Sequence, residues 1–115
     1  MNASRDAFLS GRVHVFQPER GFRAGTDSVL LAAALDKDMR GQALEIGCGA
    51  GGALFPAAWR LAEMRFTGLE RDADMLALAE RGVADNLMQE RVSLIQDDAG
   101  QMPAEWENRF DLVFS

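Results

Sequence analysis

The sequence predicts an α/β fold, in which an open, mainly parallel Rossmann-like sheet follows an N-terminal β-hairpin and helix. Two observations carry this prediction. From Gln42 onward, short apolar runs typical of strands alternate with longer segments typical of helices. A glycine-rich turn, Gly47 to Gly52, joins the first of these strands directly to a helix. Strand, glycine turn and helix form the first half of a nucleotide-binding β–α–β unit.

The composition is that of one globular domain. The chain has 115 residues, of which 48% are hydrophobic and 26% charged, so it is long enough for a core and is not disordered. Its longest apolar run, Val29 to Leu35, is too short to span a bilayer, and the N-terminus lacks the order of a secretion signal. Cys48 is the single cysteine. We therefore expect a cytoplasmic protein with no membrane contact.

Residues 1–41 are expected to form an N-terminal unit that begins with a hairpin. We interpret residues 1–10 as a flexible lead-in or a short helix. The alternation of polar and apolar residues from Arg12 to Phe16 predicts a strand. Gln17 to Gly21 has the proline and glycine of a turn, and Phe22 to Ala24 is the expected returning strand.

A nearly all-apolar helix, Ser28 to Leu35, is expected to follow this hairpin. Thr26 and Asp27 stand just before it, and either side chain can cap its first turn. Because the helix is apolar on all sides, we expect it to be buried against the sheet.

Residues 42–115 are expected to form the Rossmann-like half-domain. The predicted strands are Ala43–Ile46, Arg65–Glu70, Val92–Ile95 and Phe110–Phe114, and the predicted helices are Gly52–Glu63, Asp72 to about Leu87 and a short turn at Ala104–Glu107. Strands linked by helices pair in parallel with right-handed crossovers, which gives the order 3-2-1-4. Gly82 is expected to weaken the second helix by about 1 kcal/mol relative to alanine.

The predicted sheet is incomplete after its fourth strand. Strand Phe110–Phe114 would leave one edge without a partner, and natural proteins usually cover such an edge. We therefore expect the half-domain to be truncated after this strand. The uncovered edge is a candidate contact for a homodimer.

Acidic residues are expected at the carboxyl ends of three strands, where open α/β sheets bind their ligands. Glu70 lies 21 residues after Gly49, where a Rossmann unit places an acid for the ribose hydroxyls; an ion pair with Arg71 is the alternative. Asp97 and Asp98 end the third strand, and Asp98 can accept a hydrogen bond from an adenine amino group. A solvated turn is the alternative for this pair.

Glu45 decides which cofactor these acids suit. It lies inside the first strand, two residues before Gly47. A dinucleotide would bring a pyrophosphate, which favours helix amides and no neighbouring acid. S-adenosyl-L-methionine brings an ammonium, a sulfonium, a ribose and an adenine, and no phosphate. Glu45 therefore favours S-adenosyl-L-methionine and disfavours a nicotinamide-dependent oxidoreductase.

At these residues the sequence resembles a known family. Leu44-Glu45-Ile46-Gly47-Cys48-Gly49-Ala50-Gly51 resembles motif I of the class I S-adenosylmethionine-dependent methyltransferases. Glu70 matches their second-strand acid, and Asp98-Ala99 their adenine-side position. The segment from Phe16 to Leu31 resembles the bacterial tRNA(Val) adenine N6-methyltransferase family of the Asn-Pro-Pro-Tyr group. The resemblance covers about residues 11–115.

The resemblance implies a set of cofactor-binding residues. They are Glu45, Gly47, Cys48, Gly49, Gly51, Glu70, Arg71, Asp98 and Ala99, with Thr26 and Asp27 bordering the methionine end. Cys48 is more simply a small residue that fills the turn. The catalytic Asn-Pro-Pro-aromatic motif would follow Ser115 directly, so no catalytic residue is assigned. No metal ion is expected.

The implied function is methylation of an exocyclic amino group, adenine N6, in tRNA. Such an enzyme holds an extruded base by its amino group and by stacking. Methylation of a protein glutamine or of a small molecule is the alternative within this class. A non-catalytic module that binds S-adenosylmethionine or a partner subunit is the alternative from another class.

The charge is distributed unevenly for a protein that contacts nucleic acid. Residues 1–25 hold four arginines and two acids, a net charge of +2, whereas residues 26–115 hold eight basic and 16 acidic residues, a net charge of −8. A tRNA contact is therefore expected in the basic N-terminal segment or outside these residues. Arg12, Arg20 and Arg23 are candidate phosphate contacts, with scattered surface arginines as the alternative.

Overall fold

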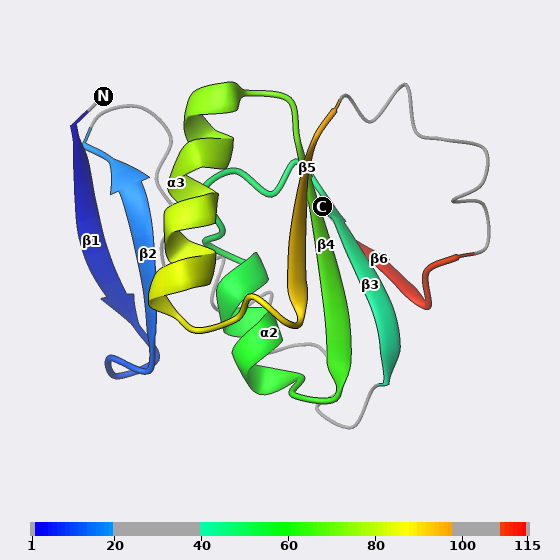
Figure 1. The fold of residues 1–115 in the computed structure, drawn as a ribbon. Coiled ribbons are helices and arrows are strands. Elements are labelled where there is room, and N and C mark those ends of the chain that lie inside the picture. The colour runs from blue at the N-terminus through cyan, green and yellow to red at the C-terminus, as the bar shows by residue number, and fades with distance from the viewer. Residues whose placement is uncertain (1, 20–39, 98–108, 115) are drawn as a thin grey trace.

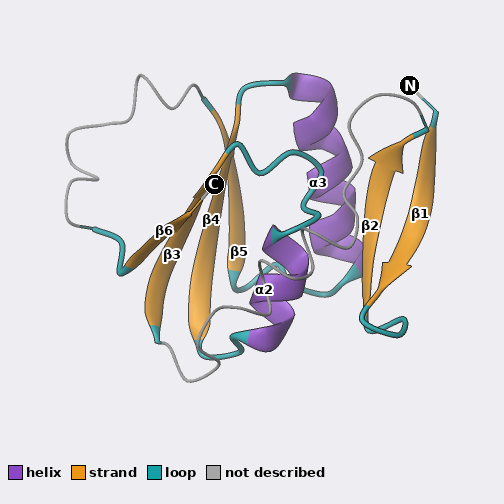
Figure 2. Cartoon of the chain, turned by 180° about the vertical axis from the view of Figure 1, so that it is seen from behind, coloured by secondary structure: helices purple, strands orange, loops and turns teal. Residues whose placement is uncertain are grey.

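The computed structural model of the chain describes residues 2–19, 40–97 and 109–114. In chain order the elements are β1 (Ala3–Phe8), β2 (Val13–Pro18), β3 (Gly41–Ile46), α2 (Leu54–Arg60), β4 (Met64–Glu70), α3 (Ala73–Asp85), β5 (Val92–Gln96) and β6 (Leu112–Phe114). Helices α2 and α3 form a middle layer, with the β1–β2 hairpin on one side and the four-stranded sheet on the other (Figures 1 and 2).

The sheet confirms the predicted Rossmann-like topology. Its strands are all parallel and lie in the order β5-β4-β3-β6, which is the predicted order 3-2-1-4. Ala43 and Phe66 are buried on the face that packs against the helices, in one cluster with Leu54 and Phe55 of α2 and Leu78 of α3. The apolar strand cores thus place this face of the sheet against α2 and α3.

The structure has an N-terminal β-hairpin, but its two strands lie earlier in the chain than predicted. Strand β1 pairs antiparallel with β2, from Ala3 opposite Pro18 to Phe8 opposite Val13. The expectation of a lead-in or helix for residues 1–10 is therefore wrong. The turn predicted at Gln17–Gly21 is wrong at Gln17 and Pro18, which belong to β2, and its last two residues lie outside the described residues. The actual turn has three successive positive φ angles, at Leu9, Ser10 and Gly11. Leucine and serine seldom adopt that conformation, so the Ser10-Gly11 pair is the one local sign of this turn.

Part of the predicted N-terminal unit lies outside the described residues. This applies to the returning strand Phe22–Ala24 and to the helix Ser28–Leu35 with its candidate caps. The short helical turn predicted at Ala104–Glu107 also lies outside them.

Helix α3 begins where the sequence places its cap. The side chain of Asp72 accepts hydrogen bonds from the backbone amides of Asp74 (2.9 Å) and Met75 (3.2 Å), two of the donors that a helix start leaves unpaired. Gly82 does not end the helix early, because α3 runs to Asp85. The ring of Phe55 occupies the space that a Cβ at Gly82 would need, so this glycine allows α2 and α3 to pack closely.

Helix α2 is shorter than predicted, and an arginine side chain binds the free carbonyl groups at its carboxyl end. It spans Leu54–Arg60 rather than Gly52–Glu63. The guanidinium of Arg91 donates to the carbonyl oxygens of Ala58 (2.8 Å) and Met64 (3.0 Å). A cation at this position satisfies free carbonyl groups and the negative end of the helix dipole. Arg91 thereby fixes the turn between α2 and β4.

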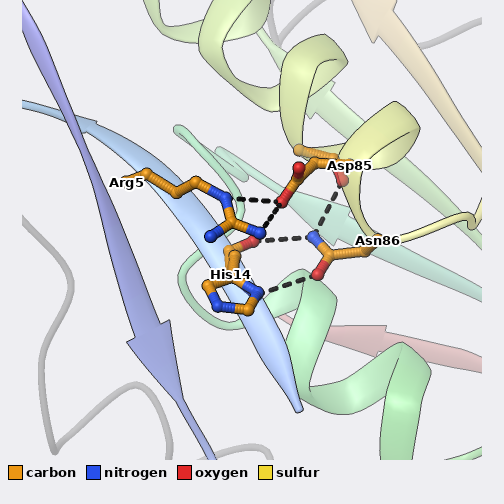
Figure 3. A network of polar contacts seen from close by, with 5 residues as sticks. Arg5, His14, Asp85 and Asn86 are labelled. Carbon is orange, nitrogen blue, oxygen red and sulfur yellow. Dashed lines mark hydrogen bonds and ion pairs between the residues drawn. The ribbon is translucent and has the colours of Figure 1, made fainter. Parts of the chain in front are cut away.

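The hairpin is joined to the end of α3 through polar contacts as well as through the core (Figure 3). The carboxamide of Asn86 accepts from the amide of His14 (2.8 Å) and donates to its carbonyl (2.6 Å), as a neighbouring strand would. Arg5 forms an ion pair with Asp85 at 2.9 Å. On the other face of β2, Val13 and Val15 are fully buried in the core.

In the part of the chain that the structure describes, no helix has both the length and the apolar character that crossing a membrane requires.

Candidate functional site

The candidate site lies at the carboxyl end of the sheet, where the glycine loop leaves β3. Gly47, Gly49 and Gly51 have φ angles of +74°, +56° and +102°, a region that other residues rarely adopt. A Cβ at Gly47 would meet no atom of the described residues within 4 Å. At Gly51, by contrast, the ring of Phe55 fills the corresponding space. The loop therefore turns tightly, packs on α2 at Gly51, and is open at Gly47.

The start of the loop is anchored to the neighbouring strand. The backbone amides of Gly47 and Cys48 both donate to the carbonyl of Leu69, at 2.8 and 3.0 Å. Leu69 immediately precedes Glu70 at the end of β4. These bonds hold the loop beside the acid that the sequence assigns to a ribose.

Glu70 connects the glycine loop to the start of α3. Its Oε1 accepts a hydrogen bond from the amide of Gly49 (2.9 Å), and its Oε2 accepts one from the amide of Asp72 (2.9 Å). Each oxygen of an ionised carboxylate has a second acceptor position. The side chain is therefore fixed in direction by the backbone and still able to accept donors from a ligand.

Arg71 does not neutralise this acid. Within the described residues, no ion pair joins Glu70 to Arg71. Arg71 is exposed, and its carbonyl accepts from the Nε2 of Gln96 at 3.3 Å. The Glu70 side chain therefore binds two backbone amides and does not form the alternative ion pair with Arg71.

Glu45 is the acid least compensated by its surroundings. It is only 5% exposed, and in the sheet it lies between Gly68 of β4 and Phe114 of β6. Its Oε1 is buried and has no hydrogen-bond partner among the described residues. Burial, and to a smaller extent the negative charge of Glu70, together raise the pKa of this carboxyl from 4.5 to about 8. A buried acid without a partner is costly, and a cationic ligand would supply the missing charge.

Cys48 is a packing residue in this loop. It is buried, and a Cβ on Gly68 would come within 2.9 Å of its sulfur, so the bare backbone of β4 makes room for the thiol. Burial raises the pKa of Cys48 to about 12, with smaller contributions from Glu45 and Glu70. The thiol is therefore protonated and unreactive at neutral pH.

The described residues bring together Glu45, the glycine loop and Glu70. Four predicted site residues, Thr26, Asp27, Asp98 and Ala99, lie outside the described residues. Asp97 lies beside the site, because its amide donates to the carbonyl of Glu70 at 3.1 Å.

Sequence reasoning missed two participants. One is the amide of Asp72, which binds Glu70 as well as starting α3. The other is Met75, whose Cε would lie 3.5 Å from a Cβ on Gly49. Neither carries a local signal, since a capping aspartate and a helix methionine are ordinary helix residues.

Comparison with known proteins agrees with this geometry. A family model described as a methyltransferase domain matches residues 43–115. Two curated relatives are tRNA1(Val) (adenine(37)-N6)-methyltransferases. The one from Yersinia enterocolitica is 32% identical over 81% of this chain and 38% of its own length. The one from Pasteurella multocida is 28% identical over 98% of this chain and 48% of its own length. The chain thus spans less than half the length of these two relatives.

Solved structures share the fold. P. horikoshii TYW2 in complex with MeSAdo superposes with a TM-score of 0.79 at 15% identity, over 96% of this chain and 41% of that protein. The mitomycin 7-O-methyltransferase MmcR gives a TM-score of 0.60 at 24% identity, over 68% of this chain and 23% of that protein. Together with the match over residues 43–115, the parallel sheet and the glycine loop, these findings place the chain in the methyltransferase domain family, with the fold of the class I S-adenosylmethionine-dependent enzymes.

Proposed function

We propose that this chain is the cofactor-binding part of an S-adenosylmethionine-dependent methyltransferase whose acceptor is the N6 amino group of an adenine in tRNA. One observation carries the cofactor assignment. Glu45 is buried beside the glycine loop, and its Oε1 has no hydrogen-bond partner in the described part of the chain; a cationic ligand would complete this environment.

The charge of the site supports S-adenosylmethionine over a dinucleotide. Glu45 and Glu70 lie close enough for the charge of one to raise the pKa of the other. A pyrophosphate placed between the loop and these acids would be repelled by Glu70 and would oppose ionisation of Glu45, whereas a cation would favour its ionised form. The ammonium and sulfonium of S-adenosylmethionine are attracted, and the cofactor carries no phosphate.

The residues present fit the other parts of this cofactor. Glu70 is already oriented by two backbone amides and is proposed to accept the ribose hydroxyls. Gly47 leaves open space where the ligand is proposed to approach the backbone. Asp98 and Ala99 are proposed for the adenine, and Thr26 and Asp27 for the methionine end, from the family resemblance alone. Bound S-adenosylmethionine supplies an activated methyl group, and these residues position it.

The acceptor is proposed from the relatives. The Yersinia and Pasteurella proteins are tRNA1(Val) (adenine(37)-N6)-methyltransferases, and the Yersinia match covers 81% of this chain. The segment Phe16–Leu31 extends the resemblance to the part of the chain that precedes the family-model match.

Thermal denaturation tests the cofactor assignment. S-adenosylmethionine and S-adenosylhomocysteine are expected to raise the melting temperature of the chain, whereas NAD is not, and the reverse ranking would contradict the proposal. Glu45→Gln is expected to reduce the shift by S-adenosylmethionine. Glu90→Gln is the matched control, because Glu90 is exposed and lies outside the site.

Methyl transfer tests the acceptor. An unmodified tRNA(Val) transcript is incubated with methyl-labelled S-adenosylmethionine and a form of the protein in which this chain is followed by the Asn-Pro-Pro-aromatic motif expected after Ser115, and the labelled nucleosides are identified by mass spectrometry. N6-methyladenosine is the expected product. Label in another nucleoside, or in glutamine residues of a protein substrate, would contradict an adenine acceptor and leave the cofactor assignment standing.

A further inference from the structure

We propose that the N-terminal hairpin, with the arginine–aromatic pairs that join it to α2 and α3, is a docking surface for the phosphate backbone of RNA. The inference rests on the proposed RNA substrate and adds the surface that holds it. The residues concerned are Arg5 and Arg12 of the hairpin and Arg81 of α3, and together they are called here the hairpin arginines.

Two of these arginines lie over aromatic rings across the boundary between hairpin and helices. The guanidinium carbon of Arg12, at the hairpin turn, lies 5.2 Å from the ring centre of Trp59 of α2. The guanidinium carbon of Arg81 of α3 lies 4.2 Å from the ring centre of Phe16 of β2. In each pair one residue comes from the hairpin and the other from a helix. Trp59 is 41% exposed, so the first pair is open to solvent.

The guanidinium groups of Arg12 and Arg81 have N–H donors that are not used within the described residues. Arg12 and Arg81 are exposed, and among the described residues no carboxylate or carbonyl accepts a hydrogen bond from either guanidinium. Stacking uses the flat face of a guanidinium and leaves its N–H groups pointing outward in the plane. Those N–H groups match two oxygens of a phosphate. The rings thus hold both cations in place without occupying their donors.

Arg5 extends the same surface and offsets a nearby acid. It is the cross-strand neighbour of Phe16, the residue on which Arg81 stacks. Arg5 forms the ion pair with Asp85 shown in Figure 3, and Asp85 lies four residues after Arg81 on α3. Asp85 is therefore compensated by Arg5, which leaves the charge of Arg81 available to a phosphate.

The acid within β1 is also engaged. Asp6 accepts hydrogen bonds from Gln17 (2.7 Å) and Ser4 (3.1 Å), and it alternates in β1 with the exposed Arg5 and Ala7. The side chains of β1 therefore direct its arginine outward and hold its aspartate in hydrogen bonds.

The cations of this surface stand beside an acidic body, since residues 26–115 have a net charge of −8. In the described hairpin, residues 2–19, two arginines balance two acids, so a phosphate would be attracted by individual guanidinium groups with unused donors and not by an excess of charge. A polyanion is repelled by the acidic body and attracted by phosphate-binding cations. Arginines beside aromatic rings are also the side chains on which single-stranded bases stack.

Binding of an unmodified tRNA(Val) transcript to the 115-residue chain tests the surface. In the double variant Arg12→Met/Arg81→Met, unbranched apolar side chains remain against the rings while both charges are lost. We expect the Kd to rise at least about tenfold and the slope of log Kd against log salt to fall by about one for each arginine. Arg109→Met is the matched control, because Arg109 also lies over a ring, that of Phe110 at 5.8 Å, but precedes β6. The control is expected to bind like the wild type.

A second measurement needs no variant. An arginine-specific dicarbonyl reagent is applied to the wild-type chain with and without the tRNA, and the modified residues are mapped by mass spectrometry. Protection of Arg12 and Arg81, with Arg109 unprotected, supports the proposal. Equal modification with and without bound tRNA overturns it, even if the double variant fails to fold.

The outcomes separate this inference from the proposed function. Variants that bind tRNA as tightly as the wild type, or a control that loses as much affinity, would overturn the hairpin surface and leave the tRNA acceptor intact. A wild-type chain that binds S-adenosylhomocysteine but not tRNA would overturn the hairpin surface and leave the methyltransferase assignment, while the tRNA acceptor is decided by the labelled nucleoside. A chain that methylates tRNA without protecting the hairpin arginines would overturn the surface alone.

Discussion

The carboxylate of Glu70 accepts a hydrogen bond from the backbone amide of Gly49, 21 residues earlier in the chain, at 2.9 Å. Its other oxygen accepts from the amide of Asp72. One side chain therefore sets the position of the glycine loop relative to the start of α3. A site whose parts are already held in place loses less conformational entropy when a ligand binds.

Replacing Glu70 is expected to weaken cofactor binding strongly. Glu70→Ala removes the acceptor proposed for the ribose and leaves the amides of Gly49 and Asp72 without their partner. We expect a loss of about 2 kcal/mol, roughly 30-fold in Kd, measured by calorimetric titration with S-adenosylhomocysteine. Glu63→Ala is the control, since Glu63 is exposed and makes only a 3.8 Å ion pair with Arg40. An unchanged affinity in Glu70→Ala would mean that this acid does not contact the ligand.

Stability is expected to fall with rising pH because of Glu45. Its pKa is about 8 in the folded chain, against an ordinary value of 4.5. Between these values the unfolded chain carries the ionised acid while the folded chain binds a proton, so folding is most favourable below pH 4.5 and weakens until about pH 8. The contribution is on the order of 3–5 kcal/mol at most. Urea unfolding across this range measures it.

The variant Glu45→Gln isolates that contribution, because glutamine does not titrate. The difference in free energy of unfolding between wild type and Glu45→Gln is expected to change steadily between pH 5 and pH 8. A constant difference would show that Glu45 has the same pKa in both states.

Replacing Leu87 with glycine is expected to stabilise the folded chain. It follows the C-cap Asn86 with a φ of +57° and is 83% exposed. The amides of Leu87 and Met88 donate to the carbonyls of Ala84 (3.2 Å) and Val83 (3.0 Å), the pattern that usually has glycine at the position of Leu87. We expect Leu87→Gly to raise the free energy of unfolding by about 0.5–1 kcal/mol. Leu87→Ala, which keeps a Cβ, is the control and should gain less.

Gly82→Ala is expected to destabilise the chain, although helix propensity alone favours it by about 1 kcal/mol. A Cβ at Gly82 would collide with the ring of Phe55. Because Phe55 is fully buried, the ring cannot move freely, and we expect a loss of about 1–3 kcal/mol in denaturant unfolding. Phe55→Leu in the same chain should recover part of the cost of Gly82→Ala. Additive losses in the double variant would contradict the contact.

Prediction from sequence succeeded where the signal is local. The alternation of apolar runs predicted β3, β4, β5 and β6 and their order, and Asp72 marked the start of α3. It failed at the hairpin, because two of the three positive φ angles of the turn lie at Leu9 and Ser10 and only one lies at a glycine, Gly11. Sequence reasoning also treated Gly82 only as a residue that weakens α3. In the structure this glycine allows the ring of Phe55 to pack closely against the helix, and that contact offsets the loss of helix propensity.

The sequence by itself determined the layout of the candidate site: a glycine loop after an apolar strand, with Glu45 before it and Glu70 at the end of the next strand. These features follow from strand periodicity and from the backbone freedom of glycine, which are properties of short segments. Only the tertiary structure decided the state of each side chain. Burial between β4 and β6 raised the pKa of Glu45, and the approach of Gly49 to β4 gave Glu70 its backbone partner. Desolvation and long-range hydrogen bonds arise between segments distant in the sequence, so no local pattern specifies them.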